Sequence, residues 1–138
     1  MKRILVMLLI GCTVAMAAGI KWEKDYATAV KQSKTLNKPM MFVISNHNCR
    51  FCVQFDNTTL KNPKVVQKLN AEYVNLLVYV DENPVFPREL LAGGTPATWF
   101  LKDNTPMFQP VMGAVDPETF LNALTIVKKE YAAQTQKK

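Results

Sequence analysis

The sequence predicts an α/β domain in which a central mixed sheet is flanked by helices on both faces. Two runs, residues 40–44 and 73–80, are rich in apolar residues that would point to both faces of a strand. Segments with apolar residues at helical spacing lie before, between and after these runs, and a further strand reverses through a polar turn. Such an alternation of helices and strands is typical of a sheet covered by helices.

An N-terminal helix is expected between residues 22 and 37. Residues 37–39 end it, because proline disfavours helical geometry in the residue before it. The continuously apolar run 40–44 then suits a central buried strand. The apolar residues of the expected helix recur at roughly helical spacing among charged and amide side chains: Trp22, Tyr26, Ala29, Val30 and Leu36.

Two helices are expected after this strand. The polar residues 45–48 form a turn, and a helix begins around Cys49 and continues toward Leu60. Asn62 and Pro63 have the pattern of an N-cap followed by proline at the first helical position, so a short helix begins there. Residues 73–80 follow as a second interior strand, because they are rich in β-branched and aromatic side chains.

The last third of the chain predicts a hairpin and a final helix. A helical turn covers residues 87–92, and residues 97–101 form a strand that reverses through a polar turn. Residues 107–112 pair back as an edge strand, since Pro110 cannot donate a ladder hydrogen bond. Asp116 caps the last helix, and residues 132–138 are expected to fray. The apolar face that this last helix is expected to bury consists of Phe120, Leu124, Val127 and Tyr131.

The first 18 residues predict a cleaved signal peptide, followed by one domain over residues 19–138. Lys2 and Arg3 precede an uncharged apolar run, and Ala15-Met16-Ala17 has the pattern of a cleavage site. The run is too short to span a bilayer. A second interpretation is a bacterial lipobox, Leu9-Ile10-Gly11-Cys12, in which Cys12 carries the lipid anchor.

Export changes both the charge and the cysteine count. Loss of Lys2 and Arg3 leaves 15 of the 17 basic residues against 11 acidic ones, a net charge of +4. The lysines are scattered without a dense basic block, which argues against a nucleic-acid-binding protein. Cleavage also removes Cys12 and leaves Cys49 and Cys52 as a pair in a compartment where disulfides persist.

The Cys49-Arg50-Phe51-Cys52 motif indicates reversible redox chemistry. A disulfide across two residues closes a tiny loop and removes little chain entropy, so it is a poor structural link. The thiolate is the attacking species, and a helix N-terminus stabilises negative charge on the first cysteine. Cys49 is therefore the expected nucleophile, with a pKa lowered further by Arg50 and His47, and the deeper Cys52 resolves the mixed disulfide.

Metal binding by these cysteines is the competing interpretation. A structural zinc site generally needs four ligands, but His47 is the sole histidine and no second CxxC motif is present. A copper site in which His47 or a methionine assists the two cysteines stays open as an alternative. The sequence predicts no cofactor and no resident metal.

Together with Gly94-Thr95-Pro96-Ala97, the CxxC motif resembles the thioredoxin superfamily over essentially the whole mature chain. Within it, residues 37–41 and 62–66 resemble exported thioredoxin-like proteins related to the C-terminal domain of the transmembrane disulfide reductase. The resemblance implies the thioredoxin fold and a thiol-disulfide oxidoreductase with Cys49 and Cys52 as its catalytic pair. It also implies that Pro96 is a cis-proline facing the sulfurs and that Thr95 and Pro96 bind an extended substrate segment.

The resemblance further implies a periplasmic protein that exchanges electrons with the thiols and disulfides of other proteins. It favours a reductase or an isomerase-like partner that receives electrons from a membrane disulfide reductase. A monomer is the simplest expectation, because no separate dimerisation segment is visible. The alternative is a non-catalytic binding module of the same fold that assists copper or cytochrome maturation.

The chain departs from the thioredoxin pattern around the motif. Asn48 stands where thioredoxins usually have tryptophan, and Arg50-Phe51 replaces their Gly-Pro. Val43 replaces the buried acid that many thioredoxins use in proton transfer, so another group or water must move protons. Asp56, one helical turn after Cys52, is interpreted as an exposed helix acid. These departures leave the direction of electron flow open.

Overall fold

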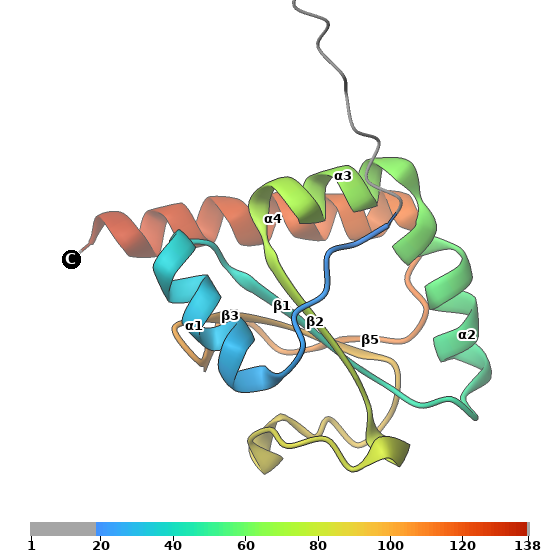
Figure 1. Ribbon diagram of the computed structural model, residues 1–138. Coiled ribbons are helices and arrows are strands. Elements are labelled where there is room, and N and C mark those ends of the chain that lie inside the picture. The colour runs from blue at the N-terminus through green and yellow to red at the C-terminus, as the bar shows by residue number, and fades with distance from the viewer. Residues whose placement is uncertain (1–18, 138) are drawn as a thin grey trace, which may run out of the picture.

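The computed structural model describes residues 19–137 of the chain. The predicted signal peptide and the alternative anchor at Cys12 lie outside the described residues. Within residues 19–137, a five-stranded mixed sheet carries helices on both faces (Figure 1), so the predicted fold class is confirmed. No helix in this part of the chain combines the length and the apolar character that crossing a bilayer requires.

The sheet is built around β1 (Met40–Ser45), which is buried at every position, as the central-strand prediction requires. β1 pairs in parallel with β2 (Val74–Tyr79) and antiparallel with β3 (Ala97–Lys102). Two short strands, β4 (Thr105–Pro106) and β5 (Val111–Met112), both pair with β3. β1, which leads into the cysteine motif, is therefore hydrogen-bonded to a neighbouring strand on each side.

Each face of the sheet has its own apolar cluster. One cluster joins the sheet to α1 (Tyr26–Leu36) and to residues 80–92. The other joins it to α2 (Arg50–Asn57), α3 (Pro63–Glu72) and α4 (Pro117–Gln136). Figure 1 shows α3 and α4 above the sheet and residues 80–92 below it. Because successive side chains of a strand alternate, β1 contributes its even-numbered residues to the first cluster and its odd-numbered apolar residues to the second.

Side-chain caps begin the helices. Asn62 accepts hydrogen bonds from two amides of α3, and Asp116 accepts two from α4, so both predicted starts are confirmed. The first helix begins at Tyr26 and not at Trp22, because Asp25 caps it by accepting from the Thr28 amide at 2.7 Å. Trp22 instead forms an isolated parallel bridge to β2.

Three further predictions, two about where helices end and one about the place of a strand in the sheet, are wrong. The helix after Cys49 ends at Asn57, and Leu60 lies in a separate 3₁₀ helix (Thr59–Lys61). β2 is the outermost strand of the sheet, and its last three residues are only partly buried. Residues 132–136 continue α4, where two alanines are strong helix formers and the Thr135 hydroxyl donates to the Tyr131 carbonyl at 2.8 Å.

The edge strand expected over residues 107–112 is divided. Only residues 111–112 pair with the start of β3, and residues 105–106 pair with its end. Pro106 and Pro110 both lack a backbone donor, so a continuous ladder across this segment is interrupted. The predicted helical turn over residues 87–92 is a 3₁₀ helix (Arg88–Leu90), preceded by another (Val80–Glu82).

Candidate active site

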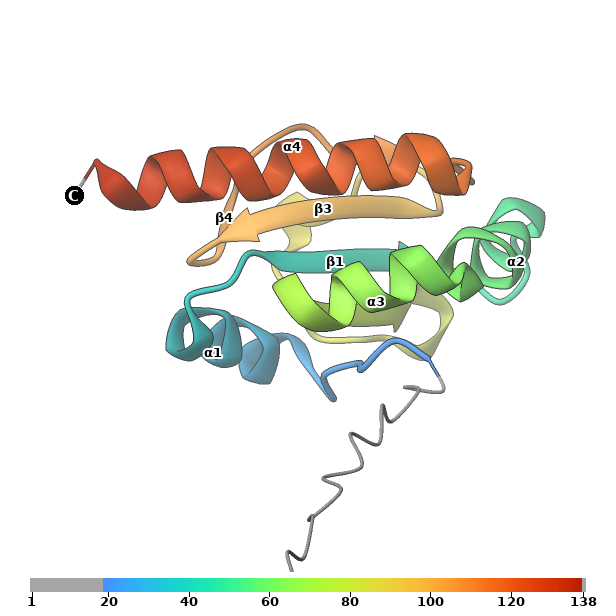
Figure 2. The ribbon, with the colours of Figure 1, turned by 90° about the horizontal axis from the view of Figure 1, so that it is seen from above.

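The cysteine motif and the Thr95-Pro96 pair lie at the same end of the sheet, where β1 finishes and β3 begins. The antiparallel pairing places Ile44, near the end of β1, opposite Ala97, the first residue of β3. Residues that follow β1 therefore emerge beside residues that precede β3. Figure 2 shows α2 beyond this end of β1.

Cys49 is the N-cap residue of α2, and its sulfur faces both the helix and the loop before β3. The Cys49 Sγ accepts a hydrogen bond from the Cys52 amide at 3.2 Å and donates one to the Thr95 carbonyl at 3.3 Å. The two cysteines are not joined by a disulfide in this structure; Cys49 is partly exposed, whereas Cys52 is 1% exposed. The first sulfur is thus reachable from solvent, and the second is covered.

The surroundings of the two thiols shift their pKa values in opposite directions. Burial opposes ionisation of Cys49, but hydrogen bonding by the side chains of Cys52 and Thr95 and by the backbone amides of Cys52 and Phe51 outweighs it, so its pKa lies below the ordinary value. Burial raises the pKa of Cys52, and so does its hydrogen bond to Cys49. Of the two thiols, the exposed Cys49 is therefore the more easily ionised, and the ionised form is the one that attacks disulfides.

Arg50 and His47 play a different part from the one predicted. Neither is among the principal groups that lower the pKa of Cys49. The Arg50 guanidinium instead lies 5.1 Å from the centre of the exposed Phe51 ring. The groups that lower the pKa of Cys49 are instead the side chains of Cys52 and Thr95 and the backbone amides at the start of α2.

The Thr95–Pro96 peptide bond is cis, and the loop that contains it is tied to β5. The Gly113 amide donates to the Pro96 carbonyl at 2.9 Å, next to the pairing of Met112 with Ala97. Pro96 is buried, and Thr95 is partly exposed beside Cys49. The loop can therefore present the Thr95 backbone to an extended segment that reaches the sulfur.

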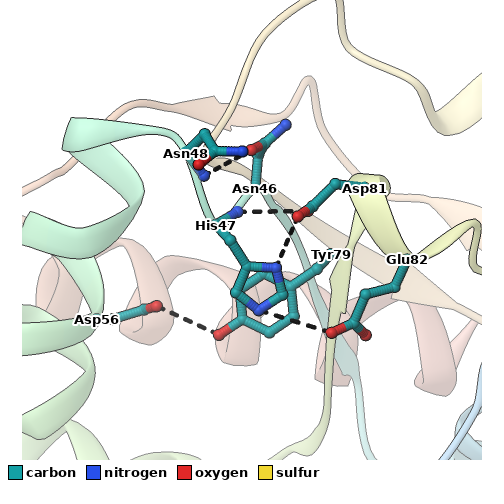
Figure 3. Close-up of polar contacts among 7 residues, drawn as sticks. All are labelled: Asn46, His47, Asn48, Asp56, Tyr79, Asp81 and Glu82. Carbon is teal, nitrogen blue, oxygen red and sulfur yellow. Dashed lines mark hydrogen bonds and ion pairs between the residues drawn. The ribbon is translucent and has the colours of Figure 1, made fainter.

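A polar cluster around His47 anchors the turn between β1 and Cys49 (Figure 3). The His47 ring stacks on Tyr79, with 3.8 Å between ring centres, and its Nδ1 lies 2.8 Å from Asp81 Oδ2. Its Nε2 is 3.6 Å from Glu82 Oε1, and its backbone amide donates to Asp81 Oδ1 at 3.3 Å. The hydrogen bond to His47 is the main cause that lowers the pKa of Asp81.

The interpretation of Asp56 as an exposed helix acid is wrong. Asp56 is partly buried on α2 and accepts a hydrogen bond from the Tyr79 hydroxyl at 3.4 Å (Figure 3). Burial raises its pKa, although the Tyr79 hydrogen bond acts in the opposite direction. Burial and the nearby charges of Asp56, Glu82 and Cys52 raise the pKa of Tyr79 in turn.

Ser45 and Tyr79 are the site residues that the sequence patterns missed. They face each other in the parallel register of β1 and β2, directly before the turn that leads to Cys49. The alternation of side chains along residues 40–45 places Ser45 on the face that carries α2. This alternation is the sequence signal that could have identified Ser45 as a site residue. Among residues 19–137, no three His, Cys, Asp or Glu side chains are grouped so that they could hold a metal ion.

Comparison with protein families gives one match that spans most of the chain. The family described as thioredoxin-like domain matches residues 26–128, a range that includes both cysteines and the Thr95-Pro96 pair. A search of curated proteins found no significant match. The family match confirms the resemblance and the fold that the two motifs predicted.

Solved structures share this fold. A thioredoxin from Thermus thermophilus has 25% sequence identity and a TM-score of 0.65, over 79% of this chain and 87% of that one. The DsbH oxidoreductase has 18% identity and a TM-score of 0.63, over 83% of this chain and 88% of that one. The C-terminal domain of Neisseria meningitidis DsbD, in its reduced form, has 18% identity and a TM-score of 0.54, over 72% of this chain and 90% of that one.

Proposed function

The chain belongs to the thioredoxin-like domain family, and from this premise we propose that it exchanges electrons with protein cysteines through Cys49 and Cys52. It is a thiol-disulfide oxidoreductase of the thioredoxin type. The observation that carries the proposal is the position of Cys49. Its sulfur caps α2, has a lowered pKa, and lies 3.3 Å from the Thr95 carbonyl.

The reaction follows from the different surroundings of the two thiols. The Cys49 thiolate attacks one sulfur of a substrate disulfide, and the other substrate sulfur leaves as a thiolate. Cys52 then attacks the Cys49 sulfur of the mixed disulfide, and the second substrate sulfur leaves. Two electrons pass to the substrate, and the protein is left with a Cys49–Cys52 disulfide. The reverse sequence oxidises a substrate dithiol.

Thr95 and Pro96 would position the substrate. An extended segment that lies against the loop before β3 could pair with the Thr95 backbone, as strands do at a sheet edge. Phe51 is 51% exposed beside the dithiol and would offer an apolar contact to such a segment. The partly exposed Cys49 sulfur is the one that this segment would meet.

We place the protein in the periplasm, as a reductase or isomerase-like partner that acts as a monomer. The support is the signal-peptide pattern in residues 1–18 and the sequence resemblance to exported proteins of this superfamily. A membrane disulfide reductase is the proposed electron donor. Cleavage that leaves Ala18 or Gly19 as the first residue and lipid anchoring at Cys12 are distinguished by the mass of the mature N-terminus.

The pH profile of the first step tests the proposed role of Cys49. We expect the rate of reaction with a small-molecule disulfide to rise with thiolate fraction and to reach half its maximum below the ordinary pKa of a cysteine thiol. The Cys52→Ser variant should keep a single titration, because only Cys49 then reacts. A midpoint at or above the ordinary value would contradict the proposed thiolate at the cap of α2.

The reduction potential separates the two directions of electron flow. A value near that of thioredoxin, about −270 mV, supports a reductant, and a value near −120 mV supports an oxidant. A protein that neither exchanges with a small-molecule disulfide nor reduces insulin would instead be a binding module. Stoichiometric copper in the reduced protein, lost in Cys49→Ser, would assign that module to metal assembly.

A further inference from the structure

Ser45 is a buried polar residue without a conventional partner. It is the last residue of β1, is 1% exposed, and its hydroxyl has no hydrogen-bond partner that meets ordinary geometry among the described residues. Buried hydroxyl groups nearly always find a partner, so an unpaired one at the edge of a functional site requires an explanation.

The neighbour of this hydroxyl is the sulfur of Cys52. Ser45 points to the sheet face that α2 covers, and Cys52 is the buried residue of the first turn of α2. The Ser45 hydroxyl and the Asn46 backbone are among the groups that favour the ionised form of Cys52. Both side chains are 1% exposed, so water does not reach either of them.

We propose that Ser45 is a positioning residue for the resolving thiol, with a hydroxyl that donates a hydrogen bond to the Cys52 sulfur as that sulfur becomes the nucleophile. The proposal rests on the proposed function, because it assigns a role within the second step of exchange. Ser45 does not touch the substrate and acts through Cys52.

The step balances without another reagent. In the mixed disulfide, the Cys52 S–H bond breaks and the Cys52 sulfur forms a bond to the Cys49 sulfur. The bond between Cys49 and the substrate sulfur breaks, its electron pair stays on the substrate sulfur, and that sulfur takes up a proton. The enzyme dithiol is oxidised by two electrons, and the substrate disulfide is reduced.

A hydroxyl suits this position because it can both accept and donate. It can accept from the Cys52 thiol in the resting state and rotate to donate to the thiolate during resolution. A carboxylate in the same place would repel the thiolate, whereas an alanine would leave the buried sulfur without a donor. Burial is the main cause that raises the Cys52 pKa. A hydrogen-bond donor at residue 45 would offset part of this cost by stabilising the negative charge on the Cys52 sulfur.

Other titratable groups near Cys52 must be kept constant in any test. These groups are Cys49 and Asp56 on α2, Tyr79 on β2 and His47 in the turn, and none of them is altered by a substitution at Ser45. A change in the pH profile of resolution then reports on the Ser45 hydroxyl.

Single-turnover kinetics with a fluorescent disulfide peptide test the proposal, because they separate formation of the mixed disulfide from its resolution. For Ser45→Ala we expect an unchanged first step, a resolution step slowed by about tenfold, and a resolution pH profile displaced to higher pH. Ser45→Thr and Ser45→Val form an isosteric pair: the two side chains have the same shape, but only threonine carries a hydroxyl. The threonine variant should resolve faster than the valine variant, even if both are destabilised by the extra bulk.

Ser33→Ala is the matched control. Ser33 is also a buried serine, 2% exposed, but its hydroxyl donates to the Lys38 carbonyl at 2.6 Å at the end of α1. This variant should lose stability without a change in the resolution rate. Equal resolution rates and pH profiles in Ser45→Thr and Ser45→Val would overturn the proposal. A wild-type protein that reduces no disulfide, together with a Cys52→Ser variant that traps no mixed disulfide, would instead overturn the proposed function itself.

Discussion

Replacement of Cys49 by serine is expected to abolish disulfide reduction, with a loss of about a thousandfold or more relative to the wild type. A serine hydroxyl does not ionise at the pH at which Cys49 becomes a thiolate, and it cannot form the mixed disulfide. We propose Cys49 as the attacking sulfur because its pKa is lowered, it caps α2 and it is partly exposed. Insulin reduction in the presence of a chemical reductant measures the loss.

The companion variant Cys52→Ser is expected to separate the two steps. Its Cys49 still attacks, but the resolving sulfur is missing, so a mixed disulfide with the substrate should accumulate and be visible by mass spectrometry. Because Cys52 is 1% exposed, direct attack by the buried sulfur on a protein substrate is not expected. If the mixed disulfide accumulated in Cys49→Ser and not in Cys52→Ser, Cys52 would be the attacking cysteine and Cys49 the resolving one.

Phe120→Ala is expected to lower the free energy of unfolding by about 3–5 kcal/mol. Phe120 is completely buried on α4 and packs edge-to-face against Phe55 of α2, with 5.4 Å between ring centres. It also lies against Phe100 of β3, with 6.4 Å between the rings. Removal of the ring leaves a cavity where the last helix, the sheet and the cysteine-bearing helix meet.

Urea unfolding of the reduced protein measures this effect. Ile126→Ala on the same helix is the matched control, since Ile126 is 60% exposed and its truncation should change the free energy of unfolding by no more than about 0.5 kcal/mol. Equal unfolding free energies for the two variants would mean that the aromatic contact between α4 and α2 contributes little to stability.

Several elements could be predicted because their signals are local. The buried run that became β1, the caps at Asn62 and Asp116, and the helix that begins at the CxxC motif each depend on residues within a few positions of one another. Hydrophobic patterning and capping need no knowledge of the rest of the chain. The family resemblance also rested on two short motifs.

The errors arose where distant segments compete for the same backbone groups. Residues 73–80 have the composition of an interior strand, but only the pairing order shows that β2 lies at the end of the sheet. The first helix is shorter than its apolar pattern because Trp22 bridges to β2 and Asp25 takes the cap. Tertiary contacts override local propensity in both places.

The sequence by itself determined the spacing of the proposed catalytic pair, because the CxxC motif sets Cys49 and Cys52 one helical turn apart at the start of a helix. Only the tertiary structure decided what surrounds them. Antiparallel pairing of β1 with β3 places Thr95 against Cys49, and parallel pairing of β1 with β2 places Tyr79 beside Ser45. The pKa values of the two sulfurs depend on burial, which the packed fold creates, and on hydrogen bonds that include one from Thr95, far away in the sequence; together they set the free energy of each charge.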